Sequence, residues 1–389
     1  MFSFQKKHGM TRHGPSVFPI FFALCLVIAN GVPLASAQSY SYTSLGTLGG
    51  SSSWAYDINN NGQVAGRSSI TGDTAVHATL WESGAVTDLG ALSGSRNSIA
   101  FGINDAGSVV GRSIGSAGFV ATLWGGGVIT DLGLGNNSTA NAINNYGQVA
   151  ATRLGPGTGQ AVSWSAGSAV DRFQTSFLRP GINDAGQMVG ESANRAVFSS
   201  GGTVTALAAV PGSVFSYAMA INNTGQIVGD SVFCGACNDR ATLWQDGVAV
   251  DLGTLGGTDS VASDINDAGQ IVGHSKNASG DYRAVLWNTA GTIVDLNSFL
   301  DAATVDAGWV LYEANAINRD GWIVGGAINT LSMMSSAFLL TPAAPERFSA
   351  ALVSSVSPVP EPEIYALLTA GLGLLGWTAR RRKRNGAVR

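Results

Sequence analysis

Short runs of apolar, often β-branched residues alternate with polar turn residues from about residue 40 to residue 342, a pattern typical of strands joined by tight turns. No long amphipathic helical pattern occurs between residues 38 and 358. One motif, Ile-Asn-x-x-Gly followed by Gln-Val-Val-Gly or a close variant, recurs seven times. The copies begin at Ile58, Ile103, Ile143, Ile182, Ile221, Ile265 and Ile317, with steps of 45, 40, 39, 39, 44 and 52 residues. A period near 40–45 residues with strand-like units is typical of β-propeller blades.

Each repeat contains four strand-like segments. The first ends in Ile-Asn, and an Asn- or Asp-containing turn with a glycine leads into the second. The third reads Ala-x-Leu-Trp and the fourth Asp-Leu-Gly, and the fourth copy is degenerate, with Ser199 and Ala206 at the Trp and Asp places. The Trp and Asp positions, seven or eight residues apart, are Trp81, Trp124, Trp164, Trp244 and Trp287, and Asp88, Asp131, Asp171, Asp251 and Asp295. We expect the tryptophans to pack between blades and the aspartates to hold neighbouring turns by hydrogen bonds.

The two ends of the array predict how the ring closes. Residues 43–50 copy the fourth-strand segment of a later repeat, residues 251–257. After the seventh Ile-Asn come a second strand, at residues 322–325, and a third, at residues 337–340, but no fourth. The N-terminal strand is therefore expected to complete the seventh blade, which leaves no open sheet edge. The prediction is an all-β, seven-bladed propeller over residues 38–342 with a linker over 343–358; another β-repeat shape is the alternative.

The Ile-Asn-x-x-Gly-Gln, Ala-x-Leu-Trp and Asp-Leu-Gly-x-Leu-Gly-Gly segments resemble the probable extracellular repeats named HAF. The resemblance covers essentially all of residues 42–341. It implies a surface-exposed protein and assigns no biochemical role.

The N-terminus has the three parts of a secretory signal. Basic residues (Lys6, Lys7 and Arg12) precede an apolar run over about 17–28. Ala35 and Ala37 then form a small-x-small cleavage site before Gln38. We predict a signal peptide over residues 1–37; an uncleaved anchor helix is the alternative.

The C-terminus, residues 359–389, has a different three-part pattern. Pro360, Glu361 and Pro362 precede an apolar segment, residues 364–379, which is predicted to be a transmembrane helix. The basic residues that follow, Arg380, Arg381 and Arg382 among them, are expected to stay cytoplasmic. This order resembles the PEP-CTERM sorting signal of exopolysaccharide-producing Gram-negative bacteria. The resemblance implies an exosortase as partner, removal of the tail near Pro362, and release or attachment at the cell surface; a permanent single-span anchor is the alternative.

The charge distribution argues against nucleic-acid binding. Nine of the 21 basic residues lie in the two terminal segments, whereas 24 of the 25 acidic residues lie in residues 38–362. The body of the protein therefore has 12 basic and 24 acidic residues, a net charge of −12. Such a body repels a phosphate backbone.

Few residues carry recognisable site chemistry. Cys234 and Cys237 are predicted to form a disulfide, since Cys25 leaves with the signal peptide and the chain is exported. The turn at residues 57–62 fits the start of a calcium loop, but the twelfth place is Ser68, so a hairpin turn is the preferred interpretation. No zinc, phosphate-loop, cofactor or nucleophile-elbow motif is found, and we predict no metal site and no catalytic residues.

Two classes of function remain. The first is a non-catalytic surface or matrix protein that binds exopolysaccharide, another glycan or a surface protein. The second is a secreted polysaccharide lyase or hydrolase. Asp, Arg and His clustered at the channel mouth would favour the enzyme, and small apolar residues there would favour binding. Loop length places a binding face at residues 67–77, 112–120, 230–240 and 274–283.

Overall fold

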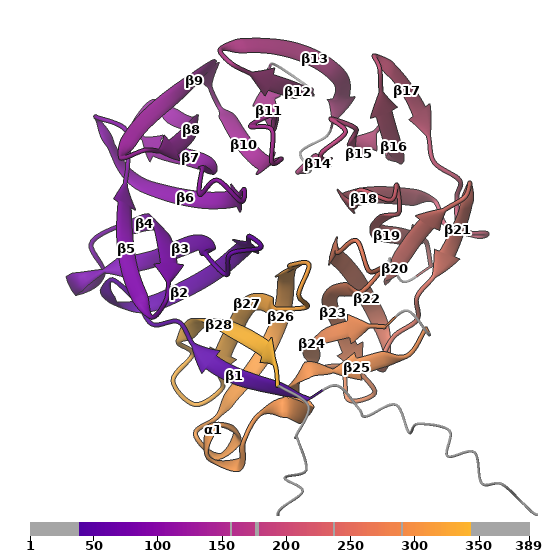
Figure 1. The fold of residues 1–389 in the computed structure, drawn as a ribbon. Helices are drawn as coiled ribbons and strands as arrows, with labels where there is room; N and C mark the ends of the chain where they lie inside the picture. Colours follow the sequence, from indigo (N-terminus) through magenta and orange to yellow (C-terminus); the bar gives the residue numbers. More distant parts are fainter. Residues whose placement is uncertain (1–38, 156–157, 176–178, 236–237, 289–290, 344–389) are drawn as a thin grey trace, which may run out of the picture. The chain divides into compact units, whose positions relative to one another are not determined.

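The computed structural model describes residues 39–155, 158–175, 179–235, 238–288 and 291–343. In these residues, 28 strands form seven four-stranded antiparallel sheets, arranged as the blades of a ring (Figure 1). The first strand of each blade lies nearest the centre of the ring (Figure 1). The predicted all-β, seven-bladed propeller is confirmed.

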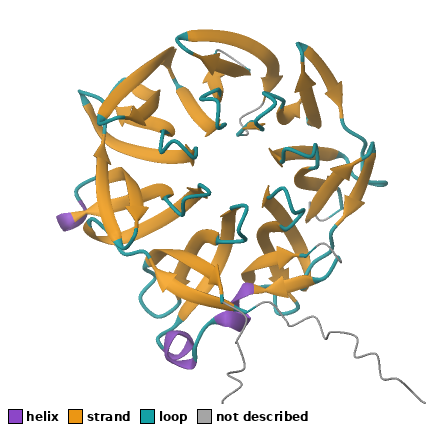
Figure 2. Ribbon diagram, in the orientation of Figure 1, coloured by secondary structure: helices purple, strands orange, loops and turns teal. Residues whose placement is uncertain are grey.

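Each of the first six blades is one continuous stretch of chain. Blade 1 consists of β2 (Gly49–Ile58), β3 (Val64–Ile70), β4 (Val76–Glu82) and β5 (Ala85–Gly90). Blade 2 consists of β6 (Ser95–Ile103), β7 (Val109–Gly115), β8 (Gly118–Gly125) and β9 (Val128–Asn136). Blade 3 consists of β10 (Ser138–Ile143), β11 (Val149–Leu154), β12 (Gly159–Ser165) and β13 (Ser168–Thr175). Blade 4 consists of β14 (Gly181–Ile182), β15 (Met188–Ser192), β16 (Arg195–Ser200) and β17 (Thr203–Ala206). Blade 5 consists of β18 (Phe215–Ile221), β19 (Ile227–Phe233), β20 (Asn238–Gln245) and β21 (Val248–Asp251). Blade 6 consists of β22 (Gly256–Ile265), β23 (Ile271–Asn277), β24 (Tyr282–Trp287) and β25 (Ile293–Asp295). The helical segments lie at the rim of the ring (Figure 2): η1 (Thr71–Asp73), η2 (Leu296–Phe299) and α1 (Ala302–Asp306).

Blade 7 joins the two ends of the array, as predicted. It consists of β26 (Trp309–Ile317), β27 (Ile323–Asn329), β28 (Ser335–Pro342) and, as its outermost strand, β1 (Tyr40–Ser44). β1 pairs antiparallel with β28, with Tyr40 opposite Pro342 and Ser44 opposite Phe338. The Tyr40 side chain is 6% exposed and packs in the core of this blade, against Phe299 among others.

A bulge near the end of the first strand explains the glycine in the recurrent Val-Val-Gly. In six blades the register shifts at the second residue before the motif isoleucine. A bulge re-aims the side chain that it leaves unpaired, and these residues line the channel: Tyr56, Phe101, Asn141, Met219, Ser263 and Asn315. The second-strand glycine lies close to a first-strand carbonyl: a Cβ at Gly111 or Gly229, for example, would overlap the oxygen of Ile99 or Tyr217. Glycine suits this close approach of two backbones, although blade 3 has Ala151 at the equivalent place.

Tryptophans of the third strands pack between blades, as predicted. Trp124 lies in a cluster with Ala65 and Ala78 of the preceding blade, and Trp244 lies in one with Val189. Their exposed fractions are 3% each. Trp124, Trp244 and Trp287 also donate Nε1–H to a carbonyl of the connection that leads out of the preceding blade.

The loops between second and third strands are shorter than the sequence predicted. Strands β7 and β8 are joined by only two residues, so most of the interval 112–120 is strand. Strands β23 and β24 are separated by four residues, and β3 and β4 by five that include η1. The polar and glycine-rich residues of these intervals suggest loops, but in the structure many of them continue the paired strands of the blade.

The predicted signal peptide with Ala35, Ala37 and Gln38 lies outside the described residues. So do the linker from residue 344, the sorting motif at Pro360, the Arg380–Arg382 cluster and the predicted helix 364–379. In the part of the chain that the structure describes, no helix has the length and apolar character needed to cross a membrane.

Candidate functional site: the central channel

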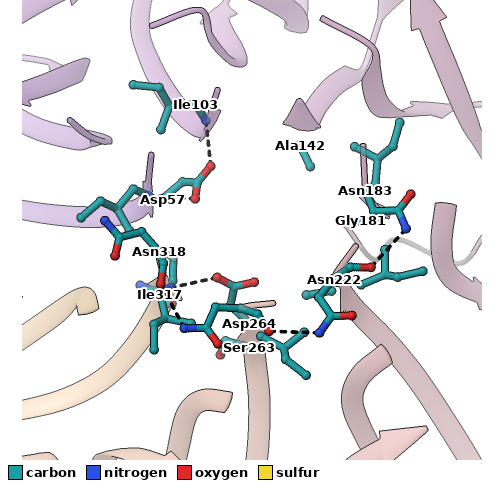
Figure 3. Close-up of a pocket in the computed structure, with 18 of the residues that line it drawn as sticks. Asp57, Ile103, Ala142, Gly181, Asn183, Asn222, Ser263, Asp264, Ile317 and Asn318 are labelled. Carbon is teal, nitrogen blue, oxygen red and sulfur yellow. Dashed lines mark hydrogen bonds between the residues drawn. The ribbon is translucent and has the colours of Figure 1, made fainter. Parts of the chain in front are cut away.

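A cavity of about 740 Å³ lies at the centre of the ring. All seven blades contribute the ends of their first strands and the turns that follow (Figure 3). These turns point into the centre of the ring in Figure 2. The loop-length prediction placed the binding face elsewhere, and of its four loop intervals only His274 contributes to the cavity wall.

The invariant asparagine of the repeat forms a closed ring of hydrogen bonds around this cavity. Each asparagine donates its Nδ2–H to the backbone carbonyl of the corresponding asparagine in the next blade, over 2.9 to 3.1 Å. The seventh closes on the first, since Asn318 donates to the Asn59 carbonyl. The members are Asn59, Asn104, Asn144, Asn183, Asn222, Asn266 and Asn318, and each is 4–5% exposed.

The same asparagine also shapes its own turn. The Oδ1 atom of Asn144 accepts from the backbone N–H groups of Tyr146 and Gln148, and its Nδ2–H donates to Gln148 Oε1 at 2.8 Å. Four other blades repeat the bond to the glutamine side chain. The motif Ile-Asn-x-x-Gly-Gln therefore encodes both a tight turn and a bond between blades.

A second, more exposed ring is built from the residue after each asparagine. Its members alternate between amide and acid: Asn60, Asp105, Asn145, Asp184, Asn223, Asp267 and, at the seventh place, Arg319. Asn60 donates both its backbone N–H and its Nδ2–H to the Asp105 carboxylate, each over 2.9 Å. The backbone N–H of Asp105 donates in turn to Asn145 Oδ1. Three aspartates and one arginine make this mouth of the channel acidic.

Two carboxylates lie deeper, at the position before the motif isoleucine. Asp57 accepts from the N–H of Ile103 at 2.8 Å, and Asp264 accepts from that of Ile317 at 2.9 Å (Figure 3). Both bonds join one blade to the next. Burial, and then the charge of Asp264, raises the pKa of Asp57 to about 8. Burial raises the pKa of Asp264 to about 7, partly offset by its backbone hydrogen bonds.

These shifts predict that the protein becomes more stable as the pH falls from 8.5 to 6.5. The folded-state pKa values exceed the ordinary value of about 3.9, so the folded state binds more protons in this window and gains stability on acidification. Asp230, whose pKa burial raises to about 8, acts in the same direction. His274, whose pKa burial lowers, opposes the trend only below about pH 6.5.

Urea denaturation midpoints at the two pH values measure this effect. The double variant D57A/D264A, which copies the alanines found at this position in blades 3, 5 and 7, should show a smaller pH dependence. An unchanged dependence in the double variant would contradict the assignment to these two carboxylates.

Another part of the channel wall is basic and aromatic. Arg179, just before β14, lies over the rings of Phe101 and Tyr56, with 4.2 and 5.1 Å from its Cζ to the ring centroids. Arg112 lies over Phe101 at 5.4 Å. His274 and the bulged residues of other blades complete the wall. The channel therefore holds Asp, Arg and His from several blades, the arrangement that the sequence analysis associated with an enzyme.

The fourth-strand aspartates have the structural role that we predicted. Asp131 and Asp251 accept from the backbone N–H two residues later, each at 2.8 Å, and so hold the turn that leads to the next blade. Asp88 and Asp171 also pair with His77 and Arg153, each at 2.8 Å. These residues lie outside the cavity wall.

The remaining candidates of the sequence have structural surroundings. Both oxygens of Asp57 accept backbone N–H groups, and Asn59 Oδ1 accepts two more, so the calcium-like turn forms hydrogen bonds within the protein. Cys234 is exposed. Cys237 lies outside the described residues, and the disulfide stays a prediction.

Sequence reasoning missed the first-strand and turn residues that line the cavity. The four predicted loop intervals do begin at one fixed place of the repeat, the residue after the second-strand Val-x-Gly or its equivalent, which varies in charge between copies while its neighbours are kept. The residues at this place are Arg67, Arg112, Thr152, Glu191, Asp230, His274 and Gly326. Of the residues at this place, His274 lines the main cavity, and Arg112 and Thr152 line a side cavity. Variation at one fixed place of a repeat indicates where the copies differ in what they contact.

Comparison with known proteins adds the sorting signal and the fold. The PEP-CTERM protein-sorting motif matches residues 358–383, which confirms the predicted signal and implies export, sorting to the cell surface and processing by an exosortase-type enzyme. No curated protein matches the chain in sequence. The resemblance to HAF repeats stays a prediction.

Several solved structures are similar to this chain at low sequence identity. The extracellular domain of BT4673 from B. thetaiotaomicron is similar with a TM-score of 0.50 and 8% identity, over 77% of this chain and 40% of that one. TolB from Acinetobacter baumannii is similar at 0.40 and 12% identity, over 69% and 76% of the two chains. The Aleuria aurantia lectin, in complex with alpha-methyl-L-fucoside, is similar at 0.36 and 9% identity, over 64% and 96%.

Proposed function

We propose that this chain is an exported, exosortase-sorted protein of the cell surface or extracellular matrix, and that its propeller binds a ligand in the central channel without transforming it. The sorting motif at residues 358–383 supports the location. A cavity of about 740 Å³ with polar groups from all seven blades supports binding, because ligand sites are concave and carry a few convergent polar groups. The resemblance to HAF repeats is consistent with a surface role.

One observation favours binding over catalysis. The two channel carboxylates, Asp57 and Asp264, each accept a backbone N–H of a neighbouring blade. Their oxygens are thus engaged in holding blades together, whereas a general base needs a lone pair directed at the substrate. In this proposal the carboxylates shape the channel and the ligand contacts other groups.

A secreted polysaccharide-active enzyme is the second candidate, and a different observation favours it. Burial raises the pKa of Asp57 to about 8, with a further contribution from the charge of Asp264, and burial raises that of Asp264 to about 7; both values lie in the range suited to acid–base chemistry at neutral pH. Arg179, His274 and Glu313 lie in the same cavity wall. In this candidate one carboxyl group would donate a proton to a leaving sugar oxygen.

Residues 38–358 contain every described strand and are the fragment for the decisive measurement. Its binding to the producer's own exopolysaccharide and to a glycan array is measured, with release of reducing ends or unsaturated sugars followed in the same wells. We expect binding without turnover. Turnover that disappears in D57A/D264A while the variant stays folded would establish the enzyme, and absence of both signals would direct the search to a protein partner.

A further inference from the structure

Three arginines lie near one another beside the channel: Arg179 lines the main cavity, Arg112 and Arg179 line a side cavity, and Arg67 acts on Arg112 through its charge. Arg67 and Arg112 occupy equivalent places in β3 and β7, and Arg179 approaches from the blade 4 side. Each guanidinium lies over an aromatic ring: Arg67 over Tyr56 at 5.9 Å, and Arg112 over Phe119 at 4.9 Å and Phe101 at 5.4 Å. Tyr56 and Phe101 are themselves in edge contact, with centroids 5.2 Å apart. The arginines and aromatic rings form one continuous cluster, which we call the arginine cluster.

Among the described residues no carboxylate forms an ion pair with the arginine cluster, although the charge of Glu313 acts on Arg179 over a longer distance. Elsewhere in the ring, Arg153 and Arg240 pair with aspartates at 2.8 and 3.0 Å. No carboxylate of the described residues lies within 4.0 Å of Arg67, Arg112 or Arg179, although residues 38–362 contain twice as many acidic as basic residues. Bringing like charges together without an opposite charge costs free energy. An anion bound from outside would recover that cost.

The polar edges of the guanidinium groups are still available for such an anion. Stacking on Phe101 and Phe119 uses the faces of Arg112, whereas its N–H donors lie in the plane. Its Nε atom is buried and has no hydrogen-bond partner in the described part of the chain. Burial and the neighbouring Arg179 charge both lower the pKa of Arg112, as expected for a cation that lacks its partner.

A side cavity of about 210 Å³ lies against these donors and shares residues with the main channel. Its wall combines Arg112 and Arg179 with the faces of Phe101 and Phe119 and the polar side chains of Thr139 and Asn141. Asn141 donates from its Nδ2 atom within the protein, to Thr139 O and Thr152 Oγ1, which leaves its Oδ1 atom as the acceptor that a ligand hydroxyl would use. The side cavity therefore combines arginine cations, aromatic rings and polar side chains that can bind hydroxyl groups.

We propose that the arginine cluster binds the carboxylate of an acidic sugar, a uronate unit of a polysaccharide, with its ring against Phe101 or Phe119. This assignment rests on the proposed binding function and names its ligand class. Arginine forks match a planar carboxylate through paired N–H···O bonds. The continuation of the channel past polar bulged side chains leaves space for further sugar units.

The acidic mouth of the channel limits the number of negative charges that the ligand can carry. Asp105, Asp184 and Asp267 surround that mouth, and the body carries an excess of acidic residues. A densely charged polyanion threading past them would be repelled. We therefore assign the arginine cluster to a chain end or an isolated uronate within an otherwise neutral glycan.

The test uses the full chain purified in mild detergent and measures binding by calorimetry to three probes. These are a neutral oligosaccharide ending in one glucuronate, the same oligosaccharide after reduction of its carboxyl group to an alcohol, and inorganic phosphate. We expect the acidic probe to bind at least about tenfold more tightly than its reduced form, because the buried charge contact is lost on reduction. Tight binding of phosphate with no preference for the acidic sugar would assign the cluster to a free anion and overturn the proposal.

Substitutions then locate the contact. R112Q and R179Q should each lower affinity for the acidic probe at least about tenfold and leave affinity for the reduced probe unchanged. R195Q, at an exposed arginine outside the cavity wall, is the matched control. Should R112Q fail to fold, R179Q decides, since Arg179 precedes β14 and lies outside the paired strands. Equal binding of acidic and reduced probes overturns only this proposal, whereas no glycan binding by the wild-type chain, its native exopolysaccharide included, overturns the proposed function as well.

Discussion

Replacing Asn144 with alanine is expected to lower the free energy of unfolding by about 3 kcal/mol, which denaturant unfolding of the propeller measures. The side chain is 4% exposed and bonds on both of its polar atoms. Its Nδ2–H donates to Asn183 O at 2.9 Å and to Gln148 Oε1 at 2.8 Å. Alanine would leave the buried carbonyl and two turn N–H groups without partners, and each such loss costs about 1–3 kcal/mol.

Two variants give the controls for this prediction. N145A, one residue further along and exposed, removes the two side-chain bonds that Asn145 forms with Asp105 N–H and Asp184 Oδ2, and is expected to cost less than about 1 kcal/mol. N144D keeps the oxygen but loses the donor and places a carboxylate against the Asn183 carbonyl. It should be at least as destabilising as alanine at pH 7 and recover on acidification. Equal stability of N144A and N145A would show that the ring of asparagines does not hold the blades together.

Deleting residues 39–45 is expected to remove about 5 kcal/mol or more of stability and to cause association of the protein. The segment buries Tyr40 and part of Tyr42 and Leu45, at about 1.5–3 kcal/mol for a fully buried side chain. The deletion also exposes the whole edge of β28, an unpaired strand that invites pairing with another molecule. Thermal melting and light scattering measure the two effects.

A rearranged chain distinguishes loss of the strand from damage to the N-terminus. In it, residues 39–48 follow residue 343 through a short turn, so that β28 and the moved strand form an ordinary hairpin. This chain should melt within a few degrees of the original and stay monomeric. If it behaves like the deletion, covalent attachment of β1 to blade 1 matters more than the fourth strand itself.

Periodicity made the architecture readable from the sequence. Seven copies at a regular spacing, and a fourth-strand segment misplaced at the N-terminus, were enough to predict the number of blades and the way that the ring closes. The packing of Trp124 and Trp244 and the turn-holding role of Asp131 and Asp251 followed because each recurs at a fixed place. The contacts that recur within each blade, or between one blade and the next, can therefore be predicted from the repeated sequence pattern.

The channel could not be predicted in this way, because its contacts connect residues far apart in the chain. Asn318 of blade 7 donates to Asn59 of blade 1, and Arg179, just before β14 of blade 4, lies over Phe101 of blade 2 and Tyr56 of blade 1. Bulges in the first strands decide which side chains enter the lumen, and an alternating strand pattern places them on the wrong face. Loop length was misleading for the same reason, since glycine-rich segments proved to be paired strand.

The outer ring of alternating Asn and Asp has an odd number of members, so the alternation must fail at one place. An asparagine next to an aspartate can donate to it, whereas two adjacent aspartates have only acceptors and repel one another. Seven is odd, so strict alternation cannot return to its start, and Arg319 of blade 7 stands at the mismatch, where its N–H still reaches Asn60. The same blade is the one assembled from both ends of the chain. The number of blades in a propeller built from this repeat should therefore change more readily by two than by one, with the mismatch kept in the blade where the two ends of the array meet.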